Sequence, residues 1–193
     1  MNNRERIQKI TGISILIGLA IVLTFISNYI PAGMVNINLT LIVIVIGACI
    51  YGPLAGLALG LVNGIITLIA PATLAVFFPL HPVLTILLCL LKTGLAGLVS
   101  GIIFKLFKST KQEFLGTVIS SIVVPIINTG LFIVGVLLFF LSVYGDATTL
   151  ITLVLSVNFL IEFASIVVLS PVIYRIIKVI SHRMEENKAV KEE

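Results

Sequence analysis

The sequence has very little charge. Only 10% of its 193 residues are charged and 59% are hydrophobic, whereas a soluble globular domain carries roughly 25% charged residues. This composition predicts an all-α integral membrane protein. At about 20 residues for each span, the chain accommodates about five to seven membrane helices and leaves no room for a soluble domain.

The motifs of common catalytic sites are also missing. There is no Walker A loop, no GxSxG, no HExxH, no histidine cluster and no pair of carboxylates. Cys49 and Cys89 lie inside apolar runs without the spacing of a metal site, so neither a disulfide framework nor a metal nor a cofactor is expected. The basic residues flank apolar segments and form no patch with aromatics. We therefore predict neither an enzyme nor a nucleic-acid partner.

The apolar runs, separated by turn residues, predict six membrane spans. They cover residues 10–30, 37–51, 53–70, 83–107, 115–142 and 148–177. Only Gly52 and Pro53 separate the second run from the third, and the second run is short for a full crossing. We expect one six-helix membrane domain over residues 1–180 and a charged cytoplasmic tail over residues 181–193.

The distribution of basic residues supports six spans with both termini in the cytoplasm. With this orientation, all of the twelve lysines and arginines except Lys92 fall in cytoplasmic segments, and the outer segments contain none. Lysine and arginine collect on the cytoplasmic side of membrane proteins. Adding or removing one span would scatter the positive charges over both sides.

Two charged residues are predicted to lie deep in the membrane. Lys92 is about 15 Å from the outer end of its helix, and Glu162 is similarly deep in the last span. Each would cost on the order of 3 kcal/mol if it faced lipid, so both should face the interior of the bundle. Either they pair with each other to join two helices, or Lys92 is the counter-ion of an anionic ligand group beside Glu162.

Asparagines on several helices accompany these two charges. Asn63, Asn128 and Asn158 all fall inside candidate spans, and Asn158 shares a helix face with Glu162. A single asparagine in a membrane helix usually bonds to a neighbouring helix. Asparagines on three helices, together with Lys92 and Glu162, favour a polar pocket.

Small residues recur at every fourth position. One stripe consists of Gly52, Gly56, Gly60 and Gly64, and a second consists of Thr93, Gly97 and Gly101. Such stripes let membrane helices approach closely, and we expect both to serve packing within the chain. Ser14 and Gly18 form a shorter pair on the first helix, and this pair could pack internally or contact another membrane protein.

Several stretches together resemble a known family. They are “GPLAGLALG”, the lysine before “GLAGLVSG”, “VPIINTGLF” and “NFLIEF”. Over essentially its whole length the chain resembles the membrane-embedded substrate-binding subunits, or S components, of energy-coupling factor (ECF) transporters, which import vitamins in bacteria and archaea. The resemblance implies a multi-pass protein in the plasma membrane of a prokaryote. It also implies a transmembrane coupling subunit and, through it, two ATPases as partners, besides membrane lipid.

The resemblance also implies roles for individual residues. Substrate in this family binds near the outer side, and the matching candidates here are Asn36, Asn38, His81, Lys92, Asn128, Asn158 and Glu162. A small-residue face of the first helix, typically AxxxA, contacts the coupling subunit in the family. Ser14 and Gly18 occupy the matching place in this sequence.

The substrate is predicted less directly. The absence of tryptophan weakens a thiamin-type pocket, where aromatic stacking would be expected. A buried cation with several amides favours a small, flexible, hydroxylated carboxylate, and the sequence resembles pantothenate-type members, so pantothenate is expected first. Folate, hydroxymethylpyrimidine or another vitamin stays open. The alternative is a small channel or scaffold protein in which Lys92 and Glu162 form a structural ion pair.

Overall fold

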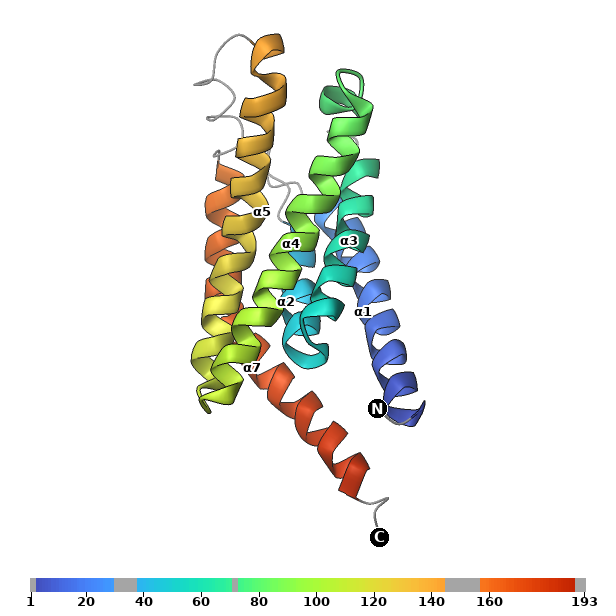
Figure 1. Cartoon of the computed structure of the whole chain (residues 1–193), viewed down its shortest axis with the longest axis vertical. Helices are drawn as coiled ribbons and strands as arrows, with labels where there is room; N and C mark the ends of the chain where they lie inside the picture. Colours follow the sequence, from blue (N-terminus) through green and yellow to red (C-terminus); the bar gives the residue numbers. More distant parts are fainter. Residues whose placement is uncertain (1–2, 30–37, 71–72, 145–156, 190–193) are drawn as a thin grey trace.

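Six helices and one short π-helical turn make up the described part of the chain. The computed structural model describes residues 3–29, 38–70, 73–144 and 157–189. In chain order the elements are α1 (Asn3–Tyr29), α2 (Thr40–Tyr51), α3 (Pro53–Ile69), η1 (Thr73–Phe77), α4 (Pro82–Ser109), α5 (Glu113–Tyr144) and α7 (Val157–Ala189). In Figure 1 they form a bundle in which the beginning of α1 and the end of α7 lie at the same end.

Four of these helices are long and apolar enough to cross a membrane. The qualifying segments are Arg6–Ser27, Pro82–Ser109, Glu113–Phe139 and Glu162–Met184. The other two helices are apolar but shorter, with 12 residues in α2 and 17 in α3. The all-α membrane architecture is therefore confirmed, whereas six full crossings and the orientation of the termini stay predictions.

The short helix α2 lies at the centre of the bundle. It contacts α1, α3, α4, α5 and α7, and all of its residues from Thr40 to Cys49 are buried except Ile42. A helix that is apolar on every side is stable only where other helices surround it. The run “TLIVIVIGAC” has this composition, so its central position follows from its sequence.

The turn between α2 and α3 consists of one glycine. Gly52 has φ of 92°, in the left-handed region that glycine adopts without a steric penalty. Pro53 is the first residue of α3, where its missing N–H costs no helical hydrogen bond. The predicted boundary between the second and third apolar runs is therefore confirmed.

Glycines bring α3 and α4 into backbone contact (Figure 1). A Cβ added to Gly56 would collide with the carbonyl of Gly97, and a Cβ on Gly97 would collide with the carbonyl of Gly56. A Cβ on Gly60 would likewise collide with the carbonyl of Thr93. The two predicted stripes thus pack against each other within the chain.

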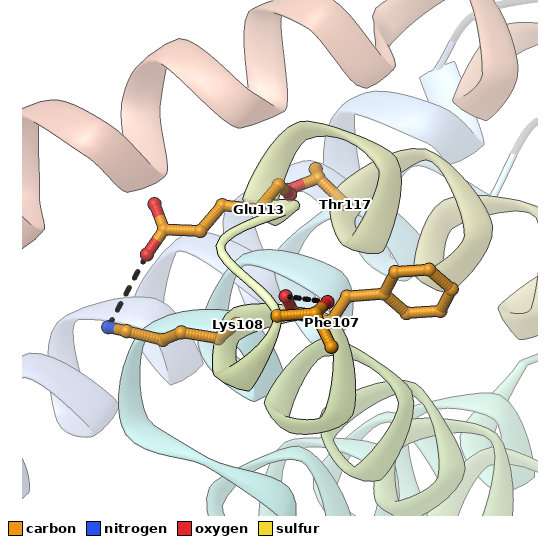
Figure 2. A network of polar contacts seen from close by, with 5 residues as sticks. Phe107, Lys108, Glu113 and Thr117 are labelled. Atoms are coloured by element: carbon orange, nitrogen blue, oxygen red, sulfur yellow. Dashed lines mark hydrogen bonds and ion pairs between the residues drawn. The ribbon is translucent and has the colours of Figure 1, made fainter.

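The turn between α4 and α5 is tied by local polar contacts (Figure 2). The Thr110 hydroxyl donates to the carbonyl of Phe107 at 2.9 Å, and the Thr117 hydroxyl donates to the carbonyl of Glu113 at 2.9 Å. Lys108 Nζ lies 3.9 Å from Glu113 Oε1. The ion pair joins the C-terminus of α4 to the N-terminus of α5, and each hydroxyl bond is local to its own helix end.

The last helix extends beyond the predicted span. It continues to Ala189, so much of the predicted charged tail is helical. Figure 1 shows the later part of α7 leaving the bundle, and Pro171 lies inside this helix. A proline in a helix interior removes one backbone hydrogen bond and bends the helix, which accounts for the change of direction.

Candidate functional site

A polar cavity lies inside the bundle where α1 and α3 end. Its volume is about 210 Å³. Every helix, or the residues just before it, contributes to the lining, which consists of Thr24, Ser27, Asn38, Thr40, Asn63, Ile66, Thr67, Ala70, Lys92, Asn128 and Glu162. Only Ile66 and Ala70 in this set are apolar. A polar hollow of this size in a membrane protein suits a small hydrophilic molecule.

Lys92 brings a buried positive charge to this cavity. It is 9% exposed and is held on α4 in the backbone contact with α3. Its Nζ lies 4.4 Å from the centre of the Phe132 ring on α5, which is the geometry of a cation–π interaction. The ring stabilises the ammonium without using its hydrogen-bond donors, so these donors stay available to an anion.

Glu162 lies near Lys92 but does not form a close ion pair with it. The two side chains attract each other electrostatically, yet the ion pairs within 4.0 Å among the described residues are Lys108–Glu113 and His182–Glu186. Glu162 lines the cavity together with Asn38, just before α2. The cavity therefore presents a lysine and a glutamate that are not in direct contact.

Three buried polar atoms of cavity residues have no hydrogen-bond partner among the residues that the structure describes. They are Ser27 Oγ, Asn63 Nδ2 and Asn128 Oδ1. Leaving a buried polar group unpaired costs about 1–3 kcal/mol, and buried polar groups are otherwise almost always paired. Their convergence on one hollow indicates a site whose remaining partners come from a bound molecule.

Comparison with protein families identifies the chain. The family model of the ECF transporter, substrate-specific component, matches residues 8–174. The chain belongs to this family. No curated protein and no solved structure matches it. It is thus an S component, which is a substrate-specific subunit of an ECF importer. Members of this family work with a membrane coupling subunit and ATPases. The family is one of transporter subunits and not of enzymes.

The S component gathers several of the predicted substrate residues at its cavity. Asn38, Lys92, Asn128 and Glu162 all line it, together with Asn63. These residues come from sequence positions far apart, and each lay at or near a predicted span. Because a charge or an amide at membrane depth must face the bundle interior, their shared orientation has a direct physical cause.

The other predicted substrate residues are not brought to this cavity. His81 is exposed at the start of α4 and is not part of the lining. Asn36 lies outside the described residues, and so does the side chain of Asn158. The roles predicted for these three residues stay predictions.

The small-residue pair of α1 faces outward in the S component. Ser14 and Gly18 are both exposed, and a Cβ added to Gly18 would meet nothing within 4 Å. By contrast, a Cβ on Gly12 would collide with the Tyr51 side chain. One face of α1 thus packs on the bundle, and none of the described residues covers the face with Ser14 and Gly18.

Besides the apolar lining residues Ile66 and Ala70, sequence reasoning missed five polar or aromatic residues at or beside the site. They are Thr24, Ser27, Thr40, Thr67 and Phe132. The hydroxyls of Thr24 and Thr40 lie 3.1 Å apart, and the Thr67 hydroxyl donates to the carbonyl of Asn63. Their helical spacing was a usable signal, because Ser27 follows Thr24 by three residues and Thr67 follows Asn63 by four. Phe132 carries no such signal in an apolar helix.

Proposed function

We propose that this S component binds a small carboxylate-bearing vitamin or vitamin precursor in the polar cavity, with Lys92 as the counter-ion of the carboxylate. One observation carries the proposal. The buried ammonium of Lys92 shares a hollow of about 210 Å³ with the three unpartnered polar atoms of Ser27, Asn63 and Asn128. A ligand with one carboxylate and several hydrogen-bonding groups would satisfy all four.

The role of Glu162 follows from its separation from Lys92. A structural ion pair joining α4 to α7 would bring the two groups into direct contact, as the channel or scaffold alternative requires. Among the described residues, Lys92 and Glu162 are not within ion-pair distance of each other, which supports a ligand role for Lys92. Glu162 then accepts a hydrogen bond from a hydroxyl or amide of the ligand.

Pantothenate is the first ligand to test. It has a carboxylate for Lys92, and an amide and hydroxyl groups for the asparagines and Glu162. The absence of tryptophan from the sequence disfavours ligands that depend on ring stacking. Folate, hydroxymethylpyrimidine and other vitamins belong in the same panel as competitors.

The proposal includes six membrane crossings, both termini in the cytoplasm and the plasma membrane of a prokaryote. The outward pair Ser14 and Gly18 is the proposed contact for the coupling subunit, through which two ATPases would drive import. The exposure of this pair supports that assignment, because membrane helices associate through surfaces where small residues allow close approach.

Thermal stabilisation of the purified S component by a panel of vitamins tests the proposal. A ligand that binds only the folded state stabilises it by RT ln(1 + [L]/Kd). We expect a clear shift with pantothenate, and we expect Lys92→Met to weaken binding at least tenfold, or about 1.4 kcal/mol. Lys105→Met is the matched control, because Lys105 is exposed on the same helix.

The outcomes separate the functions. Equal affinity in a folded Lys92→Met variant would remove the counter-ion role. No shift with any vitamin, together with ion conductance by the purified protein in liposomes, would favour the channel.

A further inference from the structure

A second hollow runs along the outside of the bundle between α1 and α3. Its volume is about 470 Å³, and its lining consists of Ile21, Thr24, Phe25, Val62, Ile65, Ile66, Ile69 and Ala70. Several of these side chains are exposed, among them Phe25 at 63%, Ile65 at 52% and Ile69 at 67%. The only polar member, Thr24, already uses its hydroxyl in a bond to the carbonyl of Ala20. We call this hollow the apolar groove.

The apolar groove adjoins the polar cavity. Thr24, Ile66 and Ala70 line both hollows, so the two adjoin along these residues. One molecule can therefore occupy the cavity with a polar group and the groove with an apolar group. The two hollows differ sharply in lining, because the cavity carries Lys92 and Glu162 and the groove carries no charge.

The position of α3 explains why this groove exists. The glycines of α3 pack against the backbone of α4, so this side of the helix is drawn tightly to its neighbour. The opposite side bears the β-branched residues Val62, Ile65 and Ile69, which line the groove beside α1. The resulting space opens toward the lipid-facing surface, where an apolar group is favoured over a polar one.

We propose that the apolar groove binds an alkyl arm of the same ligand whose carboxylate Lys92 holds, so that the substrate is an amphipathic acid. This inference rests on the proposed function of the cavity. The polar groups of the ligand satisfy Asn63 and Asn128, and the arm passes Thr24 and Ile66 to lie between α1 and α3. The volume of the polar cavity limits the size of the ligand's polar part, and the groove favours ligands that carry an alkyl arm.

A series of N-acyl-β-alanines tests the inference, because each has a carboxylate and an amide with an arm of chosen length. The probes are the N-acetyl, N-butanoyl and N-hexanoyl compounds, with pantothenate as the reference, titrated calorimetrically into the S component in lipid nanodiscs. We expect affinity to rise about fourfold for each added methylene. Ile65→Trp fills the groove and should remove this increase while leaving the affinity of N-acetyl-β-alanine unchanged.

Ile102→Trp is the matched control. Ile102 is 44% exposed on α4 and lines neither hollow, so this variant should keep the full dependence on chain length. A dependence that persists in Ile65→Trp would come from partition into lipid and would overturn the groove. Equal affinities along the series in a wild-type protein that binds N-acetyl-β-alanine would also overturn the groove and leave the cavity standing. No binding of any probe, pantothenate included, would overturn both proposals.

Discussion

The two sides of α3 differ in how closely they pack against their neighbours. On one side Gly56, Gly60 and Gly64 place its backbone directly against α4. On the other side Val62 and Ile65 border a groove of about 470 Å³ toward α1. The same helix is therefore closed to any added atom on one side and open to a further group on the other.

This difference separates the parts of the site that must be rigid from those that adapt to a ligand. A Cβ on Gly60 would collide with the carbonyl of Thr93, and one on Gly64 would lie 2.9 Å from the Thr93 hydroxyl. Thr93 directly follows Lys92, so the closed side fixes the backbone that carries the buried cation. The open side lies next to the lining residues Thr24 and Ile66, where a ligand would enter or extend.

Gly97→Leu breaks the closed side and should have the largest effect. Its side chain would collide with the carbonyl of Gly56, and neither backbone can retreat without opening the α3–α4 interface. We expect the free energy of unfolding to fall by about 3 kcal/mol or more, measured as loss of the monodisperse peak after heating in detergent.

Gly18→Leu is the control for this change. A Cβ at Gly18 meets nothing within 4 Å, and leucine favours a helix more than glycine does. The thermal midpoint should therefore stay the same or rise. Equal midpoints for the two leucine variants would contradict a closed α3–α4 interface.

Gly18→Trp tests the second open surface of the molecule, which is the exposed face of α1 with Ser14 and Gly18. The bulky ring would prevent the close approach of a partner helix at Ser14 and Gly18. We expect uptake of labelled pantothenate to fall below a tenth in cells that also express the coupling subunit and the ATPases. Affinity of the purified S component for the vitamin should not change. Normal co-purification of the coupling subunit with this variant would argue against the proposed contact.

Much of the closed side was predictable from the sequence, and much of the open side was not. Gly52 with Pro53 marked a helix boundary, and the glycine stripe predicted backbone contact. Lys92 was predictable as a cavity residue because charge at membrane depth must face inward. The groove depends on the distance between α1 and α3, which no local pattern encodes. Phe132 was not predictable, because an aromatic residue suits lipid and a cation equally well.

Asn63→Leu sharpens the comparison at the point where α3 meets the cavity. The Nδ2 atom of Asn63 is buried without a partner, so its replacement by an apolar side chain of similar shape should be neutral or stabilising for the ligand-free protein. Affinity for the ligand should fall about tenfold, because one of its hydrogen bonds is lost. Thermal midpoints with and without pantothenate measure both effects. A lower midpoint without ligand would show that Asn63 is structural.

Phe132→Leu should have the smallest effect, because it removes a ring contact of Lys92 and leaves the α3–α4 backbone contact intact. The ring centre lies 4.4 Å from Lys92 Nζ, and a cation–π contact of this kind contributes about 1 kcal/mol. The ring also contacts Phe77 of η1 edge-on at 5.3 Å. We expect the free energy of unfolding to fall by about 1 kcal/mol, whereas Phe132→Tyr should keep it. Phe132→Leu could instead lower stability as much as Gly97→Leu. In that case α5 would also position Lys92 rigidly, and the α3–α4 contact alone would not explain how its side chain is held.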